Sequence, residues 1–151
     1  MRFLAIAAVA AAAVIAVSGA SAGQPTREFS PFSDDSFSGI CSFTVSRHIL
    51  VNNTYVTTFS DGSFMYTGTF KERLRNETSG KYFDFNGSGP IIIVPTATGW
   101  TETDYGPQLE RPPGQLLLTN GPVVWQYDSD FNFLSYNQIG GTTQDVCTLL
   151  S

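Results

Sequence analysis

The stretch FMYTGTFKERLR, residues 64–75, decides the fold class, because its apolar and polar side chains alternate over most of its length. Successive side chains of a β-strand point to opposite faces, so this pattern predicts a half-buried strand rather than a helix. One face carries Phe64, Tyr66, Gly68, Phe70 and Leu74, and the other carries Met65, Thr67, Thr69, Lys71, Arg73 and Arg75. A glycine on the apolar face, Gly68, favours a bend or bulge of the kind found in barrels.

Segments with the same period, or with a strong β preference, follow one another along the chain. They are 43–51, 55–59, 64–75, 82–86, 91–94, 100–104, 115–119, 123–127, 131–136 and 145–149. Asn52-Asn53 and Asp61-Gly62 predict tight turns, and residues 105–114, with three prolines and two glycines, predict the longest ordered loop. With no helical period after residue 22, we predict an all-β, single-domain antiparallel β-barrel of about eight strands, with a β-sandwich as the alternative.

The first 22 residues have the features of a secretion signal. Arg2 is followed by an unbroken apolar run from Phe3 to Val17 and then by Ala20-Ser21-Ala22, a pattern that a signal peptidase accepts. The run is shorter than the ~20 residues that a membrane-spanning helix needs, so no membrane insertion is expected. We therefore predict a signal peptide at 1–22, a flexible N-terminal arm at 23–39 and a β-barrel domain at 40–151, secreted to the extracellular space.

The two cysteines, Cys41 and Cys147, lie near the two ends of the predicted domain. In the oxidising compartment that a secreted protein enters, they are expected to form a disulfide bond. Such a bond would tie the first strand to the last. If consecutive strands pair as hairpins, it would bring the two edges of the sheet together and close the barrel.

The charge balance narrows the classes of partner. Removal of the first 22 of 151 residues leaves 129 residues with 7 basic and 13 acidic side chains. An excess of negative charge argues against nucleic acid and against anionic membrane surfaces as partners. Cationic and neutral partners stay open.

Motifs for catalysis or metal binding are weak. His48 is the single histidine and lies on the polar face of its strand, so an exposed or inward-facing neutral histidine is favoured over a catalytic base. Asp128-Ser129-Asp130 begins like a calcium loop, but Phe133 stands where the tight-turn glycine belongs, and a polar hairpin turn explains it better. We expect no cofactor and no metal, and we lean against an enzyme.

Two pairs of charged residues stand out on the predicted strands. Glu102 and Asp104 project from the same side of one strand, which would suit paired acid–base chemistry but is more typical of a solvated acidic face. Arg47 and Glu72 interrupt the apolar faces of their strands. If both side chains point inward, they could form a buried ion pair.

Several short motifs resemble those of a known family. They are CSFTV at 41–45, TSGK at 78–81, NGSGP at 86–90, PGQL at 113–116 and DVCTLL at 145–150. Together, over Cys41 to Ser151, they resemble an uncharacterised family of small secreted actinobacterial β-rich proteins. The resemblance implies a secreted β-rich domain, and it offers no catalytic residue to transfer.

The aromatic residues Trp100, Tyr105, Trp125 and Tyr127 are the best candidates for ligand binding, because aromatic rings offer broad apolar faces to sugars and hydrophobic molecules. They could equally be core residues. Three functions follow: a non-catalytic barrel that binds a small apolar or carbohydrate ligand, a filled barrel that contacts a protein or the cell envelope, and, least favoured, a carboxylate-dependent enzyme. A large internal cavity would separate the first from the second, and a strongly raised carboxyl pKa inside it would favour the third.

Overall fold

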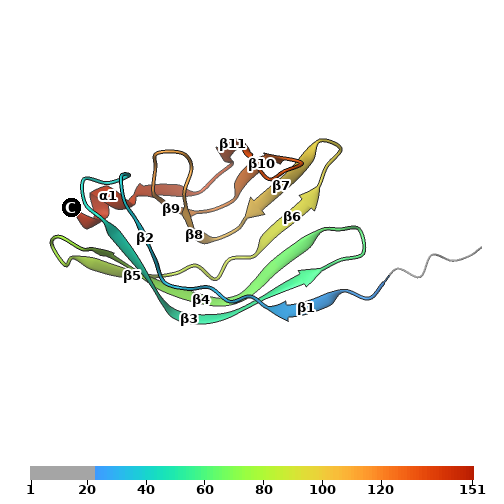
Figure 1. The fold of residues 1–151 in the computed structure, drawn as a ribbon, viewed down its shortest axis with the longest axis horizontal. Coiled ribbons are helices and arrows are strands. Elements are labelled where there is room, and N and C mark those ends of the chain that lie inside the picture. Colours follow the sequence, from blue (N-terminus) through green and yellow to red (C-terminus); the bar gives the residue numbers. More distant parts are fainter. Residues whose placement is uncertain (1–22) are drawn as a thin grey trace, which may run out of the picture.

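The structure is a computed structural model that describes residues 23–151, so the predicted signal peptide lies outside the described residues. The described chain forms twelve β-strands and one short helix (Figure 1). These are β1 (Thr26–Phe29), β2 (Asp35–Phe37), β3 (Val45–Thr58), β4 (Phe64–Asn76), β5 (Tyr82–Asn86), β6 (Ile91–Pro95), β7 (Gly99–Asp104), β8 (Pro107–Glu110), β9 (Leu117–Asn120), β10 (Val123–Asp128), β11 (Phe133–Gln138), β12 (Thr142–Asp145) and α1 (Val146–Leu150). The predicted all-β class is confirmed.

The strands form two antiparallel sheets. The larger sheet has nine strands in the order β1-β3-β4-β6-β7-β10-β11, with β2 also paired to β3 and β5 to β4, and the smaller sheet has the order β12-β9-β8. The long β3–β4 hairpin forms one wall, and the chain then curves through β6 and β7 so that β8 and β10 face it across the interior (Figure 1). Because of this curvature, residues that are far apart in the sequence line the same interior space.

The sheet does not close into the predicted barrel. Strands β1 and β11 end the large sheet, and β8 and β12 end the small one, so the first and last strands do not pair. The two-sheet sandwich that the sequence left as an alternative fits this arrangement. The disulfide bond between Cys41 and Cys147 is present, with its Cα atoms 5.3 Å apart, but it joins the loop before β3 to the terminal helix rather than two strands.

Residues 23–39 were predicted to be a flexible arm, and the structure shows two short strands within them. Strand β1 pairs antiparallel with the end of β3, and β2 pairs with its beginning. Phe37 at the end of β2 is buried in the core with Val45 and Leu74. The strands are too short for periodicity to reveal them, because four and three residues hold too few alternations.

Strand β3 is longer than expected, because Asn52-Asn53 does not turn the chain. A register shift against β4 falls between Ile49 and Val51, so one extra residue, Leu50, bulges out of the ladder. A bulge moves the following side chains to the other face. Thr54 therefore faces the interior, and Val51 is 40% exposed.

Two further corrections concern the second half of the chain. The predicted long loop contains β8, which pairs with β9. The predicted strand 145–149 is instead mostly helix α1, whose first turn is capped by Asp145 Oδ1 accepting a hydrogen bond of 2.7 Å from Thr148 N. No helix in residues 23–151 is long and apolar enough to cross a bilayer.

Candidate functional site

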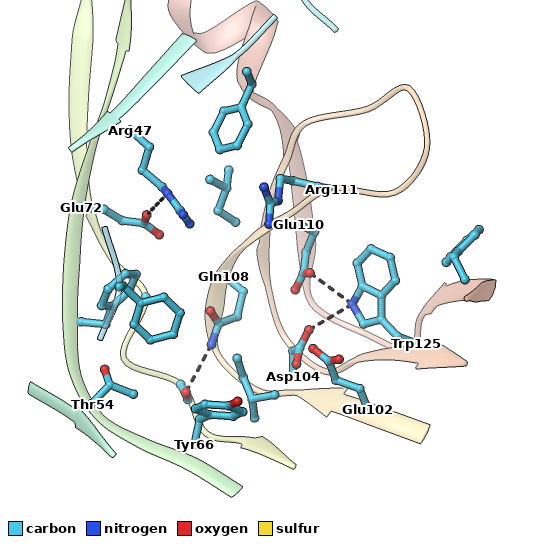
Figure 2. Close-up of a pocket in the computed structure, with 18 of the residues that line it drawn as sticks. Arg47, Thr54, Tyr66, Glu72, Glu102, Asp104, Gln108, Glu110, Arg111 and Trp125 are labelled. Carbon is cyan, nitrogen blue, oxygen red and sulfur yellow. Dashed lines mark hydrogen bonds and ion pairs between the residues drawn. The ribbon is translucent and has the colours of Figure 1, made fainter. Parts of the chain in front are cut away.

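A cavity of about 790 Å³ lies between the β3–β4 wall and the opposite wall made by β7, β8 and β10 (Figure 2). The alternation predicted for β4 is confirmed there, since Tyr66, Gly68, Phe70 and Glu72 all line the cavity. The N-terminal segment adds Phe32, which packs against Phe70, and Phe37, which lies near Arg47. The size falls within the range typical of small-molecule sites, roughly 300–1,000 Å³.

The four predicted ligand-binding aromatics divide into two pairs. Trp125 and Tyr127, both on β10, line the cavity, and their rings are nearly parallel at 8° with centroids 6.3 Å apart. Trp100 does not line it and instead stacks on Phe131 at 4.7 Å. Tyr105 lies outside it and is 41% exposed.

A cluster of three carboxyl groups, Glu102, Asp104 and Glu110, lies beside Trp125. The indole Nε1 donates hydrogen bonds to Asp104 Oδ2 at 3.0 Å and to Glu110 Oε2 at 3.2 Å. Thr119 Oγ1 lies 3.5 Å from Glu110 Oε1. All three carboxyls line the cavity, so the interpretation of Glu102 and Asp104 as a solvated acidic face was wrong.

The environment of this carboxyl cluster favours the protonated forms. Burial is the main cause that raises the pKa of Glu102 to about 8, and the neighbouring Asp104 carboxylate adds to it. Burial, then the charge of Glu110, raises the pKa of Asp104, and burial also raises that of Glu110. Tyr127 has a raised pKa for the same reasons, burial first and the Glu102 charge second.

The other end of the cavity holds the predicted ion pair. Arg47 Nε lies 3.6 Å from Glu72 Oε2, so the inward pair is confirmed. The closer partner of Arg47 is Asp35 on β2, which accepts two hydrogen bonds of 2.8 Å from the guanidinium. Burial raises the pKa of Glu72 to about 7, and Arg47 opposes that shift.

Three polar side-chain atoms that line the cavity are buried without a hydrogen-bond partner among the described residues. They are Thr54 Oγ1, Glu72 Oε2 and Asp104 Oδ1. Their residues are only 7%, 2% and 3% exposed, respectively. Buried polar atoms in proteins nearly always have partners, and those that do not need an explanation. Of the three atoms, Glu72 Oε2 still has a charged neighbour, since Arg47 Nε lies 3.6 Å from it.

Other sequence candidates lie away from the cavity. His48 is half-exposed on the outer face of β3, with Nδ1 3.1 Å from Asp34 Oδ2. In the Asp128 turn, Asp128 Oδ1 accepts hydrogen bonds of 2.9 Å from the backbone N–H groups of Asp130 and Asn132, as expected of a hairpin turn. Within residues 23–151, no group of three His, Cys, Asp or Glu side chains has the arrangement of a metal site.

Two members of the site were missed by the sequence analysis. Glu110 and Gln108 lie on β8, inside the segment predicted as a loop, so no face could be assigned to them. In the structure Gln108 Nε2 donates to Gly89 O at 3.2 Å and lines the cavity beside Glu110 (Figure 2). The alternation of Gln108 and Glu110 with Leu109 could have indicated a strand, but the prolines on both sides favoured a loop.

Comparisons of the chain with models of protein families, with curated proteins and with solved structures gave no match. The interpretation of the cavity therefore depends on its own geometry and chemistry.

Proposed function

We propose that this protein is a secreted, non-catalytic binding protein whose cavity holds one small, predominantly apolar organic molecule. The observation that carries the proposal is the cavity itself, an aromatic and aliphatic space that also contains buried polar atoms without partners. Such a mixture of apolar walls and a few polar groups is typical of ligand sites. A carbohydrate stays as an alternative ligand, and the cavity weighs against a filled domain that acts only through its surface.

Export from the cell and membership in the resembled actinobacterial family are parts of the same proposal. The disulfide bond supports export, because disulfide bonds persist mainly in oxidising compartments. The apolar run and the Ala20-Ser21-Ala22 pattern support it from the sequence.

Native mass spectrometry tests the proposal. The protein is isolated from the medium of its producing organism, and its mass is measured under native and denaturing conditions. We expect a native mass that exceeds the denatured mass by that of one small molecule. Ile91→Trp should abolish the difference, because Ile91 lines the cavity.

Val94→Trp on the same strand is the matched control, since Val94 is 39% exposed and does not line the cavity. It should keep the extra mass. A bare protein mass, together with no binding of apolar fluorescent probes to the cavity, would contradict a ligand-binding role.

A second candidate is an enzyme that uses a cavity carboxyl as a general acid. The supporting observation is the position of Glu102 in the cavity wall, where burial raises its pKa to about 8 and so favours the protonated form at neutral pH. Carboxylic acids with raised pKa values serve as proton donors in several enzyme classes. For a substrate that the wild type converts, Glu102→Gln should remove the step that depends on the proton.

A further inference from the structure

The carboxyl cluster formed by Glu102, Asp104 and Glu110 has no basic partner within residues 23–151. No ion pair joins any of the three to an arginine, lysine or histidine side chain of these residues. The two arginines that line the cavity are engaged elsewhere. Arg47 contacts Asp35 and Glu72, and Arg111 lies 3.9 Å from Asp35 with its guanidinium over the Phe37 ring. The cluster therefore has an uncompensated negative charge whenever its carboxyls ionise.

Buried carboxyl groups lose much of their hydration, and a desolvated negative charge is costly unless a proton or a cation neutralises it. Here three carboxyl groups lie together, and two of them accept hydrogen bonds from one indole. Trp125 holds one oxygen of Asp104 and one of Glu110, which fixes the orientation of both groups. Asp104 Oδ1 has no hydrogen-bond donor among the described residues other than a protonated Glu102, whose carboxyl lies beside that of Asp104, and Asp104 is 3% exposed (Figure 2).

Two features outside the three carboxyls also point to a ligand in this cavity. Thr54 Oγ1, on the opposite wall, is likewise buried and without a partner within the described chain. The parallel rings of Trp125 and Tyr127 lie beside the carboxyls and line the same space. Aromatic rings attract cations through their π faces, and this attraction is strongest where water is excluded.

We propose that the ligand is an organic cation, an amine or quaternary ammonium with an apolar remainder, whose positive group lies against Glu102, Asp104 and Glu110. This inference rests on the proposed binding function and names its ligand class. The apolar remainder extends along Tyr66, Phe70 and Ile91 toward the Arg47 end. In the free protein, bound protons neutralise the three carboxyl groups. A bound cation neutralises them instead, so binding of the cation releases protons.

The proton release gives binding a pH dependence with a definite sign. Cation binding favours ionised carboxyls, so affinity rises as pH increases through the pKa values of the cluster, about 8 for Glu102. The ionisable groups that face the cluster are Tyr127 on β10, Tyr136 on β11, and Arg47, Glu72 and Arg111 across the cavity. Burial raises the pKa values of both tyrosines, so they stay neutral over this range. Glu72 ionises on the same rise and adds negative charge.

Calorimetric titration of the exported, disulfide-bonded protein tests the inference with two probes of nearly equal shape. Phenyltrimethylammonium carries a permanent positive charge, and tert-butylbenzene is its neutral counterpart. We expect the cation to bind at least about tenfold more tightly than the neutral probe. The difference should grow from about pH 6 to about pH 9. Proton release should appear as an observed binding enthalpy that varies with the ionisation enthalpy of the buffer.

Glu102→Gln and Asp104→Asn should each reduce the preference for the cation while leaving the affinity for the neutral probe nearly unchanged. Glu28→Gln and Asp130→Asn, which make the same chemical changes at exposed positions, are the matched controls. They should keep the preference. Using two separate cluster variants keeps the test valid if one of them fails to fold.

The possible outcomes separate the inference from the proposed function. Equal binding of the two probes, or tighter binding of the neutral probe, would overturn the cation inference and leave the binding function intact. Binding of neither probe by a folded protein would count against both. A preference for the cation that Glu102→Gln, Asp104→Asn and their controls all retain would locate its site outside the carboxyl cluster and overturn the inference.

Discussion

At the scale of single residues, the main feature is a set of carboxyl groups whose protons depend on burial. Glu102 keeps its proton to about pH 8, whereas an exposed glutamate loses it near its usual value of 4.5. The folded protein therefore binds more protons than the unfolded chain between these two values. Its stability must fall as pH rises through this range, because the slope follows the difference in bound protons.

Glu102→Gln tests this pH dependence, because glutamine keeps the shape of the side chain but does not ionise. We expect the wild-type free energy of unfolding to fall between about pH 5 and about pH 8, with Glu102 contributing about 1–3 kcal/mol of the change. Urea unfolding across this range should give a flatter profile for the variant. If the free energy of unfolding changed with pH in parallel for the wild type and Glu102→Gln, Glu102 would ionise as an exposed glutamate does. Glu28→Gln, at an exposed position, is the control and should keep the wild-type pH profile.

Arg47 is the residue that neutralises the other end of the cavity. Arg47→Met should destabilise the fold by about 1–3 kcal/mol, because it removes the partner of the buried Glu72 and the closer of the two partners of Asp35. In a Glu72→Gln background the loss of stability caused by Arg47→Met should be smaller, because part of that loss comes from leaving the Glu72 carboxylate buried and unpaired. Urea unfolding of the two single variants and the double variant measures this coupling, and strictly additive losses would argue against the pair.

At the scale of the elements, the β3–β4 hairpin is the wall on which half of the site is built. It needs a close approach of two backbones at Gly68, which has a φ of +143° and pairs with Thr54. A Cβ atom at this position would lie 2.1 Å from the Asn53 carbonyl oxygen. The glycine predicted as the site of a bend is thus required by contact with the neighbouring strand.

Gly68→Ala should therefore destabilise the protein by about 2 kcal/mol or more, because neither the φ angle nor the space suits a side chain. Gly140→Ala is the control, since a Cβ there has no atom within 4 Å and the glycine has no positive φ. Thermal unfolding should show a clear decrease in Tm for Gly68→Ala and little change for Gly140→Ala. Equal Tm values for both variants would mean that the two strands can separate at Gly68 without cost.

At the scale of the whole molecule, the disulfide bond fixes the two ends of the core. It links residues separated by 106 positions, and Val146 and Leu150 of α1 pack in the same core as Phe37 and Val45. A bond that closes so long a loop restricts the unfolded chain strongly. The bond stabilises the contact between the end of the chain and the β3–β4 wall, which is where the Arg47 end of the cavity lies.

Replacement of both cysteines, Cys41→Ser with Cys147→Ser, should lower the free energy of unfolding by about 3–5 kcal/mol. Urea unfolding of this variant, and of the wild type with a reducing agent, measures the effect. The variant and the reduced wild type should have the same free energy of unfolding if the loss of stability comes from the disulfide bond itself. A double variant as stable as the oxidised wild type would show that packing alone holds α1 in place.

The sequence by itself determined the all-β class, the disulfide pair and the inward face of β4, because alternation and cysteine content are local properties that survive without knowledge of the fold. It named Trp125 and Tyr127 as candidates for ligand binding but could not separate them from Trp100 and Tyr105. Only the tertiary structure decided that Glu102, Asp104 and Glu110 line one cavity, with Asp104 and Glu110 bonded to one indole, and that the sheet stays open. The physical reason is that curvature, the Leu50 bulge and the packing of β8 against distant strands set which faces meet, and these depend on contacts across the whole chain.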